Sequence, residues 1–156
     1  MRCRFQSIAT QLSYGFSKTG DGQLYIVLAL LLPLVDSQNG WFFTQLGLIA
    51  FAIERSTYLV LKNTLKRNRP EAALQNFHSF VRPSDQFSFP SGHTAAAFVM
   101  AGLASHFYPS LAPILYLWAS LVGISRVFLG VHFPTDVLVG AGLGYSVIYY
   151  VLRLFG

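Results

Sequence analysis

The stretch of sequence that decides the fold reads Phe87-Ser88-Phe89-Pro90-Ser91-Gly92-His93 and continues as Thr94-Ala95-Ala96-Ala97-Phe98. A polar, kinked loop enters an apolar helix here, because Pro90 cannot continue a helix or strand that precedes it. Ser91 is a good N-cap, since its hydroxyl can accept a backbone N–H from the first turn. Gly92 lets a ligand approach the backbone closely. The free N–H groups and positive dipole end of the new helix favour an anion, most naturally phosphate, beside the titratable His93. The alternative is a capped membrane helix with an incidental histidine, and this stretch alone does not decide between the two.

The composition indicates a membrane protein. The chain has 156 residues, of which 53% are hydrophobic and only 11% are charged, and its mean hydropathy is +0.48. Soluble domains carry about 25% charged residues. The net charge of +5 does not indicate a nucleic-acid partner, because the charges are sparse and the basic residues cluster at Lys62, Lys66, Arg67 and Arg69. The single cysteine, Cys3, excludes an intramolecular disulfide.

The apolar segments predict an all-α, integral membrane helix bundle. Four clear spans are expected at residues 41–61, 91–108, 111–129 and 137–155. Residues 24–35 are also apolar, but a span needs about 20 residues. This run is therefore expected to be a short or re-entrant span.

The chain before residue 24 has a different character. Apolar side chains recur there at helical spacing, at Phe5, Ile8, Leu12 and Phe16. We predict an N-terminal interfacial segment, residues 1–23, followed by a single membrane-embedded domain, residues 24–156. Two spans separate the loop of residues 62–92 from the loop of residues 126–136. Both loops are therefore predicted to lie on the same side of the membrane.

Basic residues precede the polar loop at a regular spacing. Arg55, Lys62 and Arg69 are seven residues apart, so they share one helical face. Lys62 and Arg69 would lie about 10.5 Å apart along a straight helix axis, and their long side chains can converge on one phosphate. The alternative is a positive, solvated membrane edge, which is the interpretation preferred for Lys66 and Arg67.

A second cluster surrounds the start of the predicted final span. Arg126 lies at the end of a span and can donate two hydrogen bonds to phosphate oxygens. His132 and Asp136 flank the start of the next helix. A carboxylate there can fix the imidazole tautomer and leave the other ring nitrogen free to attack. The alternative is that Asp136 only offsets the helix dipole while His132 lies in an interface loop.

Three motifs together carry a family resemblance. They are Lys62 with Arg69-Pro70, then Pro90-Ser91-Gly92-His93, and then Ser125-Arg126 with His132 and Asp136. In this order and spacing they resemble the signature of the type 2 phosphatidic acid phosphatase family, lipid phosphate phosphatases related to vanadium haloperoxidases. The resemblance covers roughly residues 40–156. Many membrane members are similar to six-span bundles, so this chain departs from them in size.

The resemblance implies a role for each motif residue. His132 attacks phosphorus and forms a phosphohistidine, Asp136 orients it, and His93 gives a proton to the leaving oxygen. The phosphoryl oxygens are held by Lys62, Arg69, Arg126, Ser91 and the Gly92 amide. Three fixed cations suit a reaction in which charge develops on those oxygens. No metal or cofactor is expected, since the sequence has no carboxylate cluster or Cys/His ligand set. His78, Arg82 and Asp85 are interpreted as ordinary loop polarity.

By resemblance, the chain is expected to be a membrane phosphatase acting on undecaprenyl diphosphate, phosphatidylglycerophosphate or phosphatidic acid. The alternatives are a lipid phosphotransferase that uses the same histidine, and a membrane protein that carries phosphorylated lipid without turnover. The resemblance also places the protein in a bacterial cytoplasmic membrane with its site on the extracytoplasmic side. The positive-inside rule would instead place the basic loop inside. The sequence does not determine the oligomeric state.

Overall fold

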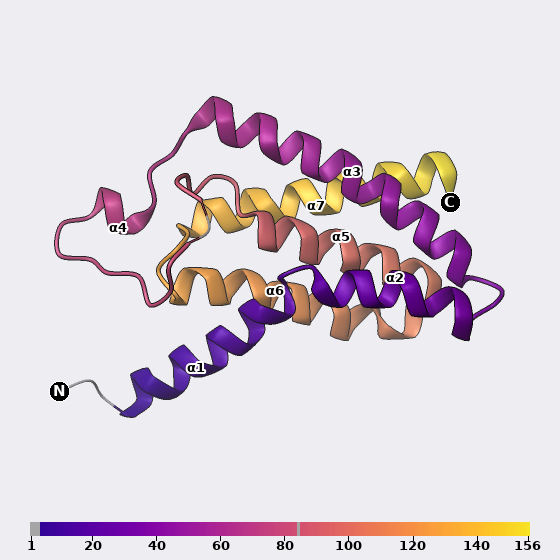
Figure 1. The fold of residues 1–156 in the computed structure, drawn as a ribbon, viewed down its shortest axis with the longest axis horizontal. Coiled ribbons are helices and arrows are strands. Elements are labelled where there is room, and N and C mark those ends of the chain that lie inside the picture. The colour runs from indigo at the N-terminus through magenta and orange to yellow at the C-terminus, as the bar shows by residue number, and fades with distance from the viewer. Residues whose placement is uncertain (1–3, 84) are drawn as a thin grey trace.

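The computed structural model describes residues 4–83 and 85–156, with side chains from Ile8 onward. Residues 1–3 of the predicted interfacial segment, and the side chain of Phe5, lie outside this description. The described chain is helical, as predicted (Figure 1). Its helices are α1 (Arg4–Thr19), α2 (Gln23–Val35), α3 (Gly40–Leu65), α4 (Pro70–Ala73), α5 (Gly92–Phe107), the 3₁₀ turn η1 (Pro109–Leu111), α6 (Ala112–Phe128) and α7 (Pro134–Phe155).

Within the described residues, two helical segments are long and apolar enough to cross a membrane, Pro109–Phe128 and Pro134–Phe155. A third candidate is the pair Ile8–Thr19 and Gln23–Val35, which bends by 45° at its break. These criteria give fewer spans than the four clear spans predicted from the sequence. The reason is that charged residues within α3 lower its mean hydropathy, while α5, with 16 residues, is too short to meet the criteria.

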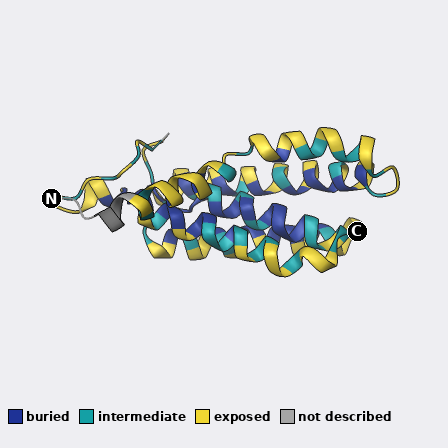
Figure 2. Cartoon of the chain, turned by 90° about the horizontal axis from the view of Figure 1, so that it is seen from below, coloured by how far each residue is buried: buried dark blue, intermediate teal, exposed yellow. Residues whose placement is uncertain are grey.

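Helix α5 lies at the centre of the bundle, where it contacts α3, α6 and α7. Its buried side chains are small or apolar, and Figure 2 shows buried residues along the inside of the bundle and exposed residues on the outer sides of the helices. Gly140 and Gly144 of α7 pack directly on α5. A Cβ at Gly140 would lie 2.5 Å from the carbonyl oxygen of Ser91, and one at Gly144 would collide with that of Ala95. These glycines let two helix backbones approach closely.

Hydrogen bonds join two parts of the polar loop between α3 and α5, and another joins this loop to the loop between α6 and α7. Asn68 and Phe87 form an antiparallel bridge, and the Ser88 N–H donates to the Arg67 carbonyl at 2.8 Å. The Phe80 N–H donates to the carbonyl of Leu129 at 3.0 Å. The two loops therefore lie at the same end of the bundle, as the count of spans between them predicted.

The N-terminal helices contact the rest of the chain. Helix α1 lies along α6 and α2 lies along α3. At the end of α1, Trp118 donates its indole N–H to the Thr19 hydroxyl at 2.9 Å. The division into an interfacial segment and a membrane-embedded domain stays a prediction.

Candidate active site

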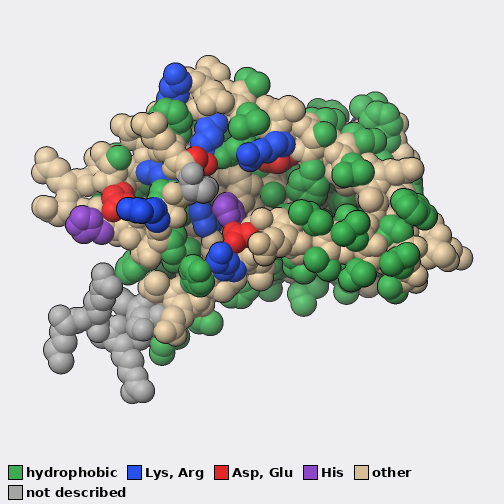
Figure 3. Space-filling model, in the orientation of Figure 1, with side chains coloured by type: hydrophobic (Ala, Val, Ile, Leu, Met, Phe, Trp, Pro, Cys, Tyr) green, Lys and Arg blue, Asp and Glu red, His purple; other side chains and the backbone are tan. Residues whose placement is uncertain are grey.

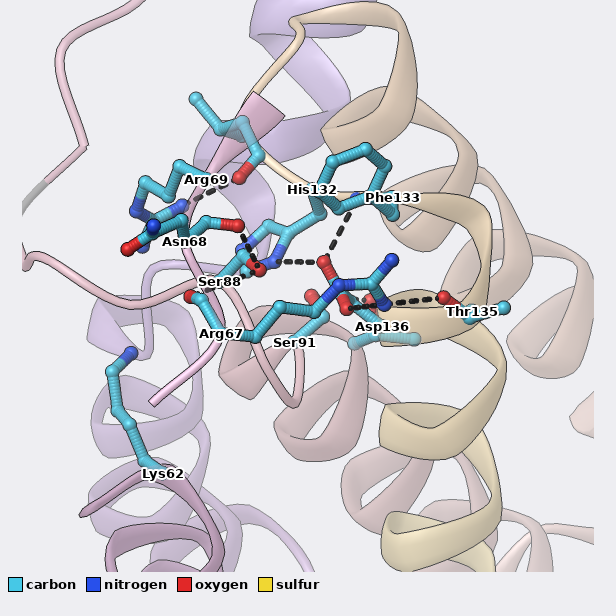
Figure 4. Close-up of polar contacts among 12 residues, drawn as sticks. Lys62, Arg67, Asn68, Arg69, Ser88, Ser91, His132, Phe133, Thr135 and Asp136 are labelled. Atoms are coloured by element: carbon cyan, nitrogen blue, oxygen red, sulfur yellow. Dashed lines mark hydrogen bonds and ion pairs between the residues drawn. The ribbon is translucent and has the colours of Figure 1, made fainter. Parts of the chain in front are cut away.

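Charged and histidine side chains gather at one end of the molecule, over the loops that precede α5 and α7, while apolar side chains cover the remainder of this face (Figure 3). The structure brings all predicted site residues to this end. The bond from the Ser91 N–H to the Asp136 carbonyl, at 3.0 Å, joins the starts of α5 and α7. Figure 4 shows Arg67, His132 and Phe133 grouped around Asp136.

His132 lies in the loop before α7 with its ring almost fully buried, at 4% exposure. Its Nδ1 is 3.7 Å from Oδ2 of Asp136, an ion-pair distance longer than a hydrogen bond. Nδ1 has no hydrogen-bond partner in the described part of the chain. Such a contact can tighten when substrate binds. The ring therefore faces Asp136 with its Nδ1 side, and Nε2 lies on the opposite side of the ring.

Asp136 is fully buried at the start of α7. Its Oδ2 accepts the backbone N–H of Phe133 at 2.8 Å, which caps the helix. Its Oδ1 accepts from Nη1 of Arg67 at 2.8 Å. The same Nη1 donates to the Thr135 hydroxyl at 2.6 Å, and the guanidinium lies 4.2 Å from the centre of the Phe133 ring. The interpretation of Arg67 as a solvated membrane edge is therefore wrong, because Arg67 holds the carboxylate that faces His132.

Lys62 and Arg69 converge as predicted, but on a carboxylate of the chain itself. Lys62 Nζ lies 2.7 Å from Oδ2 of Asp85, and Arg69 Nη2 lies 2.6 Å from Oδ1. Arg69 also donates from Nη1 to the carbonyl of Val131, beside His132, at 2.6 Å. Tyr58 accepts from Lys62 at 2.5 Å. The interpretation of Asp85 as ordinary loop polarity is wrong, since its carboxylate is bound by two of the predicted phosphate-binding cations.

The start of α5 differs in one detail from the prediction. Ser91 is the N-cap residue, but its hydroxyl makes no capping hydrogen bond. It lies 2.9 Å from the hydroxyl of Thr94 instead, and both side chains are buried. The predicted Ser91 cap is therefore wrong. Gly92 packs against a ring of α3, because a Cβ there would lie 2.9 Å from Tyr58 Cε2.

His93 and Arg126 border a polar cavity of about 620 Å³. Nε2 of His93 lies 3.0 Å from Oδ1 of Asp21, in the turn between α1 and α2. Arg126 is buried, and its Nη1 donates to the hydroxyl of Ser17 in α1 at 2.5 Å. Its Nε has no hydrogen-bond partner among the described residues. A buried cation with an unpaired donor is suited to an anion that enters the cavity.

A second, mainly apolar cavity of about 700 Å³ opens between α2, α3 and α5. It is lined by side chains such as Ile26, Leu48 and Phe51, and it reaches Gly92 and His93. The cavity therefore connects an apolar groove on the outside of the bundle to the polar end that holds the site.

The pKa shifts of two loop residues, His132 and Asp85, follow from these contacts. Burial lowers the pKa of His132 to about 4, and Arg69 and Arg126 act in the same direction against Asp136. The ring is therefore neutral and nucleophilic at pH 7. Burial alone would raise the pKa of Asp85, but its hydrogen bonds to Lys62 and Arg69 bring it below the ordinary value. Among the described residues, no group of three or more His, Cys, Asp or Glu side chains could hold a metal ion.

Sequence reasoning missed Arg67, Asp85 and the two contacts from the N-terminal helices, Ser17 and Asp21. The signal for Asp21 was weak, because it lies in the polar turn Lys18-Thr19-Gly20-Asp21-Gly22-Gln23, where a carboxylate is ordinarily solvated. No periodic signal marks Arg67, since its position depends on the pairing of Asn68 with Phe87.

The fold and the site together define a helical membrane protein. In its site, a histidine faces a carboxylate and lies beside a cluster of cations that can bind an anion. Comparison with protein families matches residues 42–156 to PAP2, the PAP2 superfamily. The chain belongs to this superfamily, which confirms the resemblance found in its motifs. It is accordingly an integral, multi-pass membrane protein.

Individual relatives agree with this family. Phosphatidylglycerophosphatase B of Bacillus subtilis is 39% identical over 134 residues, which cover 74% of this chain and 63% of that protein. The chain thus spans less than two thirds of that relative's length. The crystal structure of Aquifex aeolicus LpxE superposes with a TM-score of 0.83 at 30% identity, over 94% of this chain and 86% of that one. A transmembrane PAP2 type phosphatidylglycerolphosphate phosphatase from Bacillus subtilis superposes with a TM-score of 0.76 at 29% identity, over 99% and 78% of the two chains.

Proposed function

We propose that the protein is a metal-independent phosphatase that hydrolyses a lipid phosphate or diphosphate through a phosphohistidine at His132. One observation carries the proposal: a buried, neutral imidazole faces the Asp136 carboxylate, and Arg69, which binds the Asp85 carboxylate, also binds the backbone next to His132. An anion site and a nucleophile are thus adjacent. The names of the relatives support the substrate class, since two of them are phosphatases of a phosphorylated glycerolipid.

The reaction divides into two displacements. In the first, Nε2 of His132 forms a bond to phosphorus, the bond to the leaving oxygen breaks, and His93 gives that oxygen a proton. In the second, water attacks phosphorus, loses a proton to His93, and the P–N bond breaks to release inorganic phosphate and neutral His132. Charge on the equatorial oxygens is stabilised throughout by fixed donors. In this proposal these donors are Lys62, Arg69, Arg126, Ser91 and the Gly92 amide.

The apolar groove supports a lipid as the carrier of the phosphate. It opens between α2 and α3 and leads to the start of α5. A hydrocarbon chain in this groove would stay in apolar surroundings while its phosphate reaches the cations. Candidate substrates are undecaprenyl diphosphate, phosphatidylglycerophosphate and phosphatidic acid.

We further propose that α3, α5, α6 and α7 cross the membrane and that α2 is a short or re-entrant span. Helix α3 has 26 residues and is about 39 Å long, which is sufficient to cross. Exposed aromatic side chains at its start, Trp41 and Phe42, suit a membrane interface. The proposed location is a bacterial cytoplasmic membrane, with the site on the extracytoplasmic side.

Sidedness is tested with a cysteine at Gln75, an exposed residue of the polar loop, in a chain in which Cys3 is replaced by serine. An impermeant thiol reagent should label intact cells. Labelling that requires lysis would place the site on the cytoplasmic side.

The activity is tested by phosphate release from a panel of lipid phosphates with purified protein in detergent. We expect turnover that persists in excess chelator and is inhibited by vanadate, and that is lost in His132→Ala but kept in the surface control Glu71→Gln. Tight lipid binding without release would indicate a carrier. Transfer of phosphate to an added acceptor lipid, in preference to water, would indicate a phosphotransferase.

A further inference from the structure

We propose that the N-terminal elbow, defined as residues 14–22 at the junction of α1 and α2, is a working part of the active site. In this proposal Asp21 positions the proton donor His93, and Ser17 positions the phosphate-binding Arg126. The inference rests on the proposed phosphatase function. Both residues lie before residue 42, where the match to the PAP2 superfamily begins.

The elbow forms one wall of the polar cavity. The residues that line this wall are Tyr14, Ser17, Lys18 and Asp21, and His93 and Arg126 lie in the same cavity. Spacings of three and four residues place side chains on one face of a helix, so α1 turns a single face to the site. The elbow is held against the bundle by the hydrogen bond from Trp118 to Thr19 and by the packing of α1 on α6.

The contacts of Asp21 are directed at the site. Helix α2 has no side-chain cap, so the Asp21 carboxylate does not serve as a helix cap. Its partners are Lys18 Nζ at 3.1 Å and His93 Nε2 at 3.0 Å. In the described part of the chain, His93 makes its ring hydrogen bond only through Nε2. The carboxylate thus fixes the ring orientation and leaves Nδ1 available for the leaving oxygen.

Asp21 also favours the protonated state that a general acid requires. A carboxylate in contact with an imidazole stabilises its charged form. The charged groups that act on His93 are Asp21 from the elbow, Arg126 from α6 and Asp85 from the polar loop. Only Asp21 is in hydrogen-bond contact, so its removal should change the titration of His93.

Ser17, in the same wall, contacts a different cavity residue, Arg126. Its hydroxyl accepts a hydrogen bond from Nη1 of Arg126, and both residues are buried. Without this contact the long side chain of Arg126 has more conformational freedom, and its donors are less well directed at the phosphate. Loss of the hydroxyl should therefore weaken phosphate binding more than it slows the chemical step.

The central experiment compares Asp21→Asn with the wild type in the full chain. Steady-state rates are measured with a lipid phosphate, whose leaving oxygen needs a proton, and with an aryl phosphate, whose leaving group does not. The loss of a hydrogen bond between charged groups typically corresponds to about 10- to 100-fold. We expect kcat for the lipid to fall by about that factor, with less than about a 3-fold change for the aryl phosphate. The alkaline limb of the lipid pH profile should move to lower pH, and Glu71→Gln should change none of these values.

For the second contact, Ser17→Ala should weaken inhibition by inorganic phosphate several-fold, and Ser17→Thr, which keeps a hydroxyl, should restore it. The proposal is overturned if Asp21→Asn lowers the rates with both substrates equally and leaves the pH profile unchanged, because that is the behaviour of a structural residue. It is also overturned if the rates with both substrates are unchanged.

A readout independent of turnover separates this proposal from the proposed function. The imidazole of His93 is titrated by NMR in isotope-labelled protein, and its midpoint should fall in Asp21→Asn relative to the wild type. An unchanged midpoint would exclude Asp21 as the partner of His93, even in an active enzyme. A lowered midpoint in a protein that releases no phosphate would uphold the contact and refute the phosphatase.

Discussion

Asp85 is expected to compete with the substrate for the cations of the site. Its carboxylate lies 2.7 Å from Lys62 Nζ and 2.6 Å from Arg69 Nη2, and it accepts from the Tyr58 hydroxyl at 3.3 Å. The side chains of both cations are 8% exposed, so few other anions can reach them. A phosphoryl group needs the same donors. The substrate must therefore displace Asp85 or share the cations with it.

The size of this competition follows from the contacts. Hydrogen bonds to charged groups contribute about 1.5–3 kcal/mol each. The Asp85 side chain is 38% exposed, so solvent screens the pair, and we expect its displacement to cost about 1–2 kcal/mol in total. This corresponds to about 5- to 30-fold in binding. Asp85→Asn should therefore lower the inhibition constant of inorganic phosphate, and the KM for a lipid phosphate, by about that factor.

The assay is competitive inhibition by phosphate or vanadate in detergent, run together with thermal unfolding. Asp85→Asn should bind phosphate more tightly but unfold at a lower temperature, because two buried cations lose their carboxylate. Asp85→Glu, which keeps the charge, should stay close to the wild type in both measurements. Weaker phosphate binding in Asp85→Asn would refute the reasoning, since Asp85 would then be a support that holds Lys62 and Arg69 in place.

Further predictions concern the nucleophile and its support. Arg67→Met should lower kcat by about 10- to 100-fold with little change in KM, because Arg67 contacts Asp136 and not the phosphate. Steady-state rates check this, with Lys66→Met at the exposed neighbouring residue as the control. Rapid quenching with labelled substrate should trap an acid-labile, base-stable phosphoramidate that is absent in His132→Ala, whereas an acid-stable label that disappears in Ser91→Ala would identify the serine as nucleophile. Because the pKa of His132 is lowered to about 4, protonation should remove the nucleophile only as pH falls through about 4. The pH profile of kcat/KM with an aryl phosphate checks this, and an acid limb near 6.5 would contradict the burial of the ring.

The sequence was sufficient to predict α5, α6 and α7 and the motif residues that meet at the site. Helical length and apolar periodicity locate α5, α6 and α7, and counting the spans between loops places the motifs at one end. Arg67 and Asp85 could not be predicted in the same way. Their contacts depend on how the polar loop folds back on itself, and a loop has no periodicity from which a partner can be read. Asp85 also resembles a solvated loop residue until Lys62 and Arg69 are seen to share it.

The N-terminal helices were predicted from local pattern alone, and this explains why their role in the site was missed. An amphipathic pattern shows that α1 has an apolar face, but it does not show which element that face contacts. In the structure the apolar side chains Ile8, Leu12 and Phe16 are exposed, whereas Ser13 and Ser17 are buried where α1 packs on α6. Ser17 thereby meets Arg126, and Asp21 in the turn that follows meets His93. Asp21 then differs from other loop carboxylates because the helix bend at Gly22, with a φ of 87°, turns the chain over the cavity.

Close packing of α5 and α7 has a chemical consequence as well as a structural one. In the proposed mechanism, the proton donor His93 is the second residue of α5, and Asp136, which orients the nucleophile, is the third residue of α7. Their separation is therefore set by how closely the two helix starts approach, which Gly140 controls through its contact with the Ser91 carbonyl. A larger residue there would push α7 away from α5 and move His132 relative to His93. Gly140→Val should consequently reduce turnover of lipid phosphates even in molecules that still fold, whereas Gly142→Ala, at a glycine with open space around it, should leave turnover unchanged.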